Sequence, residues 1–466
     1  MVGGRFVREL RRYRDVLRAW VLSRQLLTHD RWSSEELAAH QAERLSALVQ
    51  HAATRSRFYR DLYKGIRLDQ PVQLQNLPVI TKAMVMEDFD RLVTDPKLHL
   101  SEIQDYLKHA AGDALYDGEY RALSTSGTTG LKGIFVYGRL EWSLVLADTL
   151  RWQYVVGVRP RLPDRLRIAT IGAGSPAHVS YRLTASGDVG LFKFRILDAT
   201  AGMNELVRAL NDFQPDVLLP YPSVGALLAA EQLEGRLRIQ PRIISTHSET
   251  LSSGMAAIME KAWGHAPLDH YGLSEHPNCG CACKYRKGIH LFEDLFIAEV
   301  VDDRNRPVPA GEQGFKLLLT NLYNFTQPLI RYEVSDMLTI GKEMCPCGRP
   351  FRLVSKIGGR SDDIIYLRGM GGATVPIHPL HFYDAIEAEE GIKQYQITAG
   401  SDGICVQLVA RSGVDKASLS KALIERLNRS LSAAGAVGAK LEVEFVGQLK
   451  PSSELMGKTK LIVSRP

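Results

Sequence analysis

The chain has 466 residues, too many for one ordinary hydrophobic core, so we expect two or three structural units. With 45% hydrophobic and 24% charged residues, it has the composition of a soluble globular protein. Its formal net charge of +6 is too small to indicate a nucleic-acid partner. It has no run of 18 apolar residues, so no transmembrane helix is predicted.

The start of the chain predicts two helices. Residues 5 to 24 carry seven arginines against two acidic residues, which suits a membrane-surface helix or a helix docked on the body. We favour the docked helix, held by its Leu, Val and Trp side chains. No continuous apolar segment follows the arginines, so no secretory signal is expected. Residues 33 to 53 predict the second helix, because Ser33 and Glu36 can form a capping box ahead of an apolar face.

From about residue 120 to 330, short β-rich runs alternate with helical runs. The expected strands lie at 166–172, 216–220 and 242–248, and the expected helices at 203–213, 225–235 and 253–264. Strands and helices that alternate at this spacing predict a layered α/β domain.

The character of the sequence changes near residue 358, where GGRSDDIIYLRGMGG is rich in glycine and charge. We expect strands at 392–398, 404–410 and 440–446, and a long helix at 416–432. These elements predict a separate small α+β unit. We therefore divide the chain into residues 1–361 and 362–466.

Residues 124 to 133 read STSGTTGLKG, with five hydroxyl side chains and two glycines before the lysine and a third glycine after it. Such a stretch buries little, but its backbone N–H groups and hydroxyls can approach phosphate oxygens closely. The spacing differs from a Walker A loop. Taken alone, the stretch fits a flexible surface linker equally well.

Further motifs favour a phosphate-binding loop over a flexible linker. STSGTTG resembles the nucleotide loop of the adenylate-forming enzymes, which include acyl-CoA synthetases, peptide-synthetase adenylation domains and luciferase. YGLSE (271–275), PLIRYEVSD (328–336), GRSDD (359–363) and MGKTK (456–460) resemble later motifs of that superfamily, in its order. LPYPS (219–223) and CPCGR (345–349) resemble the phenylacetate–CoA ligase branch and the related CapK-type proteins. The resemblance implies a large N-terminal adenylation domain and a small mobile C-terminal lid.

The resemblance also implies ATP-dependent activation of a carboxylic acid to an acyl-adenylate, with release of pyrophosphate. Glu275 would ligate Mg²⁺, Asp336 would hold the ribose of ATP, Arg360 and Lys458 would stabilise charge during transfer, and Asp362 would be the hinge. The residues implied in nucleotide binding are Ser124, Thr125, Ser126, Gly127, Thr128, Thr129, Gly130, Glu249, Tyr271, Gly272, Ser274 and Asp336.

The resemblance places the acid near aromatic and imidazole side chains, which suit an aryl or polar-substituted acid better than a long fatty chain. The implied pocket residues are Tyr137, His178, Tyr181, Tyr221, Ser223, His247 and His270. CoA is the first acceptor to consider. However, residues 371–382 read GGATVPIHPLHF and look closer to CapK-type proteins, so an amine acceptor or a stand-alone adenylate stays open. A non-catalytic nucleotide-binding relative is a further alternative, and a homodimer is among the open oligomeric states.

Five of the six cysteines fall in two tight clusters, which favours a metal site in a reducing cytoplasm over a disulfide scaffold. Thiolates and an imidazole are the ligands that zinc prefers in a closed tetrahedral site. By resemblance to zinc-binding members of the branch, the predicted ligands are Cys283, His290, Cys345 and Cys347. Cys281 is an alternative to Cys283.

Overall fold

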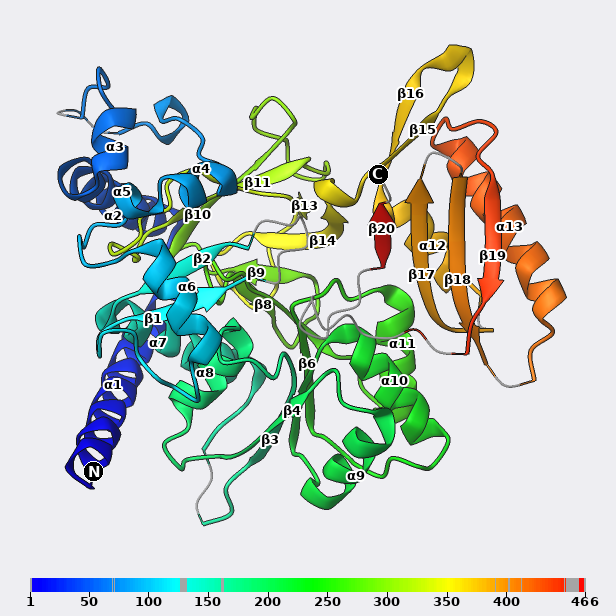
Figure 1. Ribbon diagram of the computed structural model, residues 1–466, viewed down its shortest axis with the longest axis horizontal. Helices are drawn as coiled ribbons and strands as arrows, with labels where there is room; N and C mark the ends of the chain where they lie inside the picture. Colours follow the sequence, from blue (N-terminus) through cyan, green and yellow to red (C-terminus); the bar gives the residue numbers. More distant parts are fainter. Residues whose placement is uncertain are drawn as a thin grey trace.

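The computed structural model describes residues 2–68, 70, 72–125, 132–160, 163–389, 391–400, 403–411, 413–447, 449 and 461–464. Figure 1 shows a large N-terminal body and, beside it, a smaller unit formed by the last hundred residues. The α/β class expected from the sequence is confirmed.

Helices dominate the first part of the chain. They are α1 (Val2–His29), α2 (Ser34–Arg55), α3 (Arg57–Leu62), α4 (Lys82–Glu87), α5 (Phe89–Leu92) and α6 (Leu100–His109), with a short 3₁₀ turn η1 (Leu74–Asn76). The capping box predicted for α2 is present: the Ser33 hydroxyl accepts from the N–H of Glu36, whose carboxylate accepts from the N–H of Ser33. These bonds satisfy helix-end donors and fix where α2 begins.

The first helix packs along α7 (Arg139–Val156), as Figure 1 shows. Ala19 and Leu26 are buried in the contact, and Asp15 accepts two hydrogen bonds from Arg139 at 2.8 and 3.0 Å. Docking of α1 on the body is thus confirmed. The expectation that its tryptophan holds it there is wrong, because Trp20 is 53% exposed. Among the described helices, none is long and apolar enough to cross a bilayer.

The centre of the body is a nine-stranded sheet in the order β13-β14-β9-β8-β7-β6-β5-β3-β4. Its parallel half contains β3 (Arg167–Gly172), β4 (Lys193–Asp198), β5 (Val217–Pro220), β6 (Ile243–His247) and β7 (Leu268–Tyr271). Its antiparallel half contains β8 (Gly280–Ala282), β9 (Ile289–Leu291), β13 (Asp336–Ile340) and β14 (Leu353–Arg360). All three strands predicted between residues 166 and 248 lie in the parallel half.

Helices cover both faces of the parallel half, which explains why β3 and β5 are apolar at successive positions. One face packs on α9 (Met203–Phe213), α10 (Pro222–Leu233) and α11 (Ser253–Trp263), all three of which were predicted. The other face packs on α7, with α8 (Val179–Gly187) nearby. Residues of β3 alternate between the faces: Ala169 and Ile171 belong to the first, and Ile168 to the second. Thr170 therefore faces α7.

Two smaller sheets complete the body. They are the pair β1 (Arg121–Ser124) and β2 (Ile134–Tyr137), and the antiparallel trio β10 (Phe296–Val301), β11 (Lys316–Asn321) and β12 (Tyr332–Val334). Both belong to the largest hydrophobic core, which also takes in α2 and the short helices after it.

The C-terminal unit has its own hydrophobic core. It contains β15 (Ile365–Arg368), β16 (Thr374–Ile377), α12 (Pro379–Glu387), β17 (Ile392–Gly400), β18 (Gly403–Ala410), α13 (Lys416–Ala433), β19 (Leu441–Phe445) and β20 (Ile462–Ser464), with short 3₁₀ turns η2 (Ser361–Asp363) and η3 (Met370–Gly372). Four of these strands form a sheet in the order β19-β18-β17-β20, and α13 packs on it through Leu423, Leu427 and Leu431. The strands and the long helix expected here are all present.

Candidate active site

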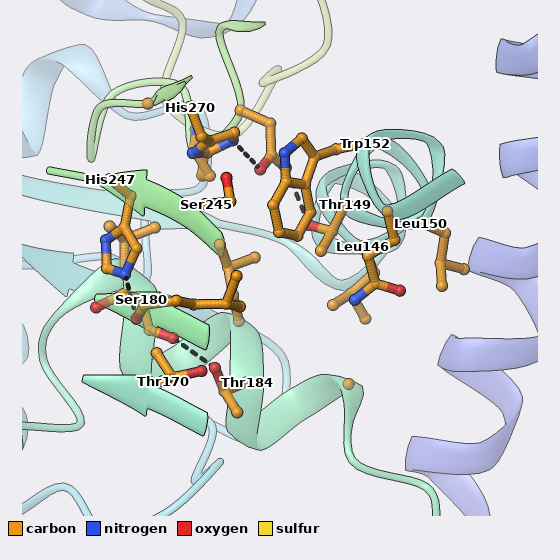
Figure 2. A pocket seen from close by; sticks show the side chains of 18 of the residues that line it. Leu146, Thr149, Leu150, Trp152, Thr170, Ser180, Thr184, Ser245, His247 and His270 are labelled. Carbon is orange, nitrogen blue, oxygen red and sulfur yellow. Dashed lines mark hydrogen bonds between the residues drawn. The ribbon is translucent and has the colours of Figure 1, made fainter. Parts of the chain in front are cut away.

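Two adjoining cavities open at the carboxyl ends of the parallel strands, where ligands bind in open α/β sheets. The larger has a volume of about 490 Å³ and is lined by residues following β6, β7 and β12, and by Tyr383 and Leu461 of the C-terminal unit. The smaller has a volume of about 120 Å³ and lies between the parallel strands and α7 (Figure 2). Val179, Ser248, His270 and Gly272 line both, so the cavities meet at these residues.

The stretch of hydroxyl residues and glycines at 124–133, the hydroxyl–glycine loop, begins beside the larger cavity. Ser124 ends β1, and Thr125 lines the cavity. Thr125 also closes the base of the loop, because its Oγ1 accepts a 2.8 Å hydrogen bond from the N–H of Gly133. The other predicted loop residues, Ser126, Gly127, Thr128, Thr129 and Gly130, lie outside the described residues, as does Lys458.

Three predicted residues meet in the wall of the larger cavity. Asp336 and Arg360 face each other across the β13–β14 pair, and Arg360 Nε donates to Asp336 Oδ1 at 3.1 Å. The Tyr271 hydroxyl donates to Asp336 Oδ2 at 2.7 Å. Burial, together with the neighbouring carboxylate, raises the pKa of Tyr271 well above its usual value, so the hydroxyl keeps its proton. Asp336 is thus a nearly buried carboxylate held from both sides.

Glu275 also lines the larger cavity and is 8% exposed. Its Oε1 accepts a 3.1 Å hydrogen bond from the Tyr332 hydroxyl. Burial raises the pKa of Glu275, while the charges of Lys82 and Arg360 oppose the rise. A carboxylate of this kind gains stability from a cation placed beside it.

Lys82 is a cavity residue that the sequence analysis missed. It is the first residue of α4, and burial lowers its pKa. A Cβ added at Gly133 would lie 3.1 Å from Lys82 Cε, so the lysine stands beside the end of the hydroxyl–glycine loop. Nothing in the local pattern singles it out, because its position depends on the fold.

The remaining predicted nucleotide residues line the same cavity. Gly272 and Ser274 follow β7, and Glu249 follows β6. A Cβ at Gly272 would collide with the carbonyl oxygen of Pro277, so only glycine fits there. Glu249 Oε2 accepts a 3.0 Å hydrogen bond from the N–H of Ser223, which joins two predicted residues at this edge. Asp362 lines the cavity from η2, at the start of the C-terminal unit.

The predicted acid-pocket residues divide into two groups. His247 and His270 line the smaller cavity, and Ser223 and His270 line the larger one. Four lie behind the cavity walls: Tyr137 donates to the carbonyl of Ser274 at 2.8 Å, Tyr221 accepts from the N–H of Ala173 at 2.9 Å, His178 caps α8, and Tyr181 lies within α8. The hydrogen bonds of Tyr137, Tyr221 and His178 are with the protein itself.

His270 stands where the cavities meet, and its proton position follows from its neighbours. Asn278 Nδ2 donates to the carbonyl of Val145 and to Thr149 Oγ1, so its Oδ1 faces His270. His270 Nε2 therefore donates to Asn278 Oδ1 at 3.1 Å. Burial lowers the pKa of His270 to about 4, which keeps the ring neutral.

The four predicted metal ligands come together away from both cavities. The ligand atoms of Cys283, His290, Cys345 and Cys347 all lie within 4.8 Å of one another. Cys283 Sγ lies 3.6 Å from Cys345 Sγ, and His290 Nε2 lies 3.3 Å from Cys347 Sγ. Ligands of tetrahedral zinc, about 2.0–2.3 Å from the metal, are spaced by roughly 3.4–3.8 Å. The alternative, Cys281, packs instead in an apolar cluster with Phe292 and Phe351.

Comparison with known proteins identifies the class. No protein-family model matches the chain. It is similar in structure to a 2-hydroxyisobutyryl-CoA ligase in the postadenylation state, with a TM-score of 0.74, 20% identity, and coverage of 94% of this chain and 91% of the other. It is also similar to an anthranilate CoA ligase, with a TM-score of 0.54, 16% identity, and coverage of 72% and 64%. The fold is therefore that of the adenylate-forming enzymes.

Sequence comparison gives a narrower set of related proteins. The chain is 28% identical to the phenylacetate-coenzyme A ligase of Thermus thermophilus over 382 residues, 79% of each chain. It is 22% identical to Protein CapK of Staphylococcus aureus over 426 residues, 88% of this chain and 85% of the other. The chain is thus similar in sequence to phenylacetate–CoA ligases and to CapK, which confirms the resemblance stated from its motifs.

Proposed function

We propose that the chain is an AMP-forming acid–CoA ligase, which activates a carboxylic acid with ATP and then transfers the acyl group to CoA. The observation that carries this proposal is the pair of joined cavities. The larger holds the Tyr271–Asp336–Arg360 cluster and the buried Glu275, and the smaller offers an apolar space beside them. The phenylacetate–CoA ligase homologues support the same assignment.

In the first half-reaction, a carboxylate oxygen of the acid attacks the α-phosphate of ATP. A new O–P bond forms, the bond to the β-phosphate breaks, and pyrophosphate leaves. In the second, the CoA thiol attacks the acyl carbon, and AMP leaves with the oxygen that joined it to the acyl group. Two anions meet in the first step, so fixed cations and N–H donors must offset their charge.

The cavity residues named above have the following proposed tasks in this reaction. Asp336 accepts hydrogen bonds from the ribose hydroxyls of ATP, and Tyr271 orients that carboxylate. Arg360 and Lys82 supply positive charge beside the phosphates, and Thr125 begins the loop that holds the pyrophosphate portion. Glu275 would hold Mg²⁺, whose charge offsets that of the phosphate oxygens.

We further propose that residues 362–466 form a lid that rotates about Asp362 between the half-reactions, and that Lys458 enters the site from it. Tyr383 and Leu461, which line the larger cavity, support a position of the lid over the nucleotide. The chain has a TM-score of 0.74 to the hydroxyisobutyryl-CoA ligase in its postadenylation state and 0.58 to the same ligase in the thioesterification state. This difference supports a rotation between two arrangements of the same units.

For the cysteine cluster we propose a structural zinc. Three thiols and one imidazole are a preferred zinc donor set, and four protein ligands leave no open position for substrate. Burial lowers the pKa of His290 to about 4, so the ring is neutral as a ligand must be. Zinc would join the strand β9 to the loop before β14. A reducing compartment such as the cytoplasm would keep these thiols available.

The proposal is tested by pyrophosphate release from ATP–Mg²⁺ across a panel of aryl and amino-substituted acids, with and without CoA. Acid-dependent release, with a thioester formed only when CoA is present, is the expected result. An acyl-adenylate without a thioester would instead support an amine acceptor or a stand-alone adenylating enzyme. ATP binding with no release for any acid would favour a non-catalytic relative.

A further inference from the structure

The smaller cavity has a lining that restricts what can occupy it. Among the described residues, no Asp, Glu, Lys or Arg lines this cavity, and most of the surface that lines it is apolar. The neutral His270 adds no charge. An uncompensated charged group would therefore be costly to bury here. Apart from its carboxylate, the occupant must be uncharged.

The size of the cavity restricts the occupant as well. Its volume of about 120 Å³ is close to that of an apolar cavity of about 150 Å³ that holds benzene. Val16 and Ala19 of α1 line it together with Leu146 and Leu150 of α7, so the docked N-terminal helix contributes to the wall. An acid with a body the size of one ring fits this space, whereas a long acyl chain does not.

Three polar atoms in this apolar lining have no partner. They are Thr170 Oγ1, Ser245 Oγ and Trp152 Nε1, each buried and without a hydrogen bond to any described residue. Figure 2 shows Thr170 and Ser245 on the strands and Trp152 on the facing helix, around the same space. Buried polar groups are nearly always paired, and one left unpaired costs free energy. Three unpaired polar atoms around one cavity indicate that the occupant carries a hydrogen-bonding group.

The strand register gives the depth of these atoms. Thr170 pairs with Leu219, and Leu218 pairs with Ile244, so Thr170, Leu219 and Ser245 form one row across three strands. His247 pairs with His270 at the mouth shared with the nucleotide cavity, two residues beyond Ser245. Two residues of strand span roughly 7 Å. The Ser245 hydroxyl thus lies about one ring length from the place where the carboxylate must meet ATP, and Thr170 lies two strand spacings, roughly 10 Å, to its side.

We infer that the acid substrate is a compact, uncharged, ring-sized carboxylic acid that carries a hydroxyl on the side opposite its carboxylate. The inference deepens the proposed function and rests on it. The hydroxyl of the acid hydrogen-bonds Ser245, and it accepts from the Trp152 N–H, which can only donate. These two side chains select the acid, while the nucleotide cavity performs the chemistry.

The test compares 4-hydroxybenzoic acid with 4-methylbenzoic acid, since a methyl group matches the hydroxyl in size but forms no hydrogen bond. Two quantities are measured: the Kd of each acid by calorimetry with a non-hydrolysable ATP analogue present, and kcat/KM for acid-dependent ATP–pyrophosphate exchange. We expect the hydroxy acid to be preferred about tenfold or more in both, because the methyl analogue leaves the polar atoms unpaired. Decanoic acid should not compete with either.

Single substitutions test whether the preference for the hydroxy acid depends on the cavity hydroxyl. Ser245→Ala should shrink the ratio between the two acids towards one and leave the Kd of 4-methylbenzoic acid near its original value, which also reports correct folding. Thr184→Val is the matched control. Thr184 lines the same cavity, but its hydroxyl already donates to the carbonyl of Ser180 at 3.0 Å, so the ratio should stay unchanged.

The two readouts separate this inference from the proposed function. Preferred binding of the hydroxy acid that is lost in Ser245→Ala, without exchange for any acid, would support the inference and refute the ligase activity. Exchange in which 4-methylbenzoic acid equals or exceeds the hydroxy acid would support the activity and overturn the inference. Tight binding of decanoic acid, or binding of neither ring acid, would also overturn it.

Discussion

A buried arginine connects α7 to the loop before β10, and replacing it should destabilise the protein strongly. Arg151 is 0% exposed. Its Nη1 donates to Asp294 Oδ2 at 2.8 Å, its Nη2 donates to Asp148 Oδ1 at 2.8 Å, and its guanidinium carbon lies 4.1 Å from the ring centre of Phe292. His29, the last residue of α1, contacts the same Asp294 oxygen through Nδ1 at 2.8 Å. Arg151→Met keeps much of the apolar volume and removes the charge.

The magnitude follows from what the substitution leaves behind. The Asp148 and Asp294 side chains are 2% and 0% exposed, so neither regains water when Arg151 is lost. Breaking a buried ion pair costs about 3–5 kcal/mol. Asp294 keeps His29 as a partner, whereas Asp148 keeps no hydrogen-bond partner among the described residues, so we expect about 4 kcal/mol. Burial already raises the pKa of Asp148 to about 7, so the loss should be smaller at pH 6, where protonation relieves the charge, than at pH 8.

Urea unfolding of the parent protein and of Arg151→Met, at pH 6 and at pH 8, measures this loss of unfolding free energy. Arg91→Met is the control: Arg91 pairs with Asp61, the two side chains are 46% and 70% exposed, and exposed pairs contribute about 1 kcal/mol or less. A loss below about 1 kcal/mol for Arg151→Met, or a loss that grows as the pH falls, would refute the reasoning.

Three further predictions address the site. Tyr271→Phe removes one hydrogen bond to Asp336 and should raise the KM for ATP about tenfold in pyrophosphate exchange; an unchanged KM would contradict the proposed ribose role. Cys347→Ser should reduce zinc, measured by elemental analysis, below one atom per chain, whereas Cys405→Ser should retain it; equal zinc in both would exclude the proposed ligand set. Burial raises the pKa of Asp269 from 3.8 to about 7, so the folded state binds the proton more tightly and this group's contribution to stability is lost as the pH rises from about 4 to 7. In thermal unfolding, Asp269→Asn should therefore gain stability relative to the parent as the pH rises; a constant difference would argue against this.

Local patterns predicted the elements that depend on neighbouring residues. The capping box of α2 uses Ser33 and Glu36, three residues apart, and both can be recognised in the sequence. The strands and helices of the parallel half follow from runs of apolar residues with the right period. The candidate metal ligands were found because a group of three cysteines, a histidine and a later pair of cysteines stand out in the sequence, and the resemblance selects four of these residues. Asp336 and Arg360 were found through the order of the motifs.

The acid cavity could not be predicted in the same way. Thr170 and Ser245 are ordinary strand residues in the sequence, and only the register of β3, β5 and β6 brings them level. Lys82 reaches the nucleotide cavity because α4 packs beside the loop after β1, a contact between distant segments. Conversely, Tyr137 and Tyr221 have the right residue type, but their hydroxyls bond to the protein itself. Which way such a side chain faces is decided by packing.

The most direct test of the central claim follows an oxygen atom from the acid to AMP. The acid, selected by pyrophosphate exchange and labelled with ¹⁸O in its carboxylate, is incubated with ATP–Mg²⁺ and CoA, and the AMP is analysed by mass spectrometry. A ligase that joins the carboxylate to the α-phosphate must leave one labelled oxygen in AMP and one in the thioester. Unlabelled AMP, or ADP in its place, would contradict the account.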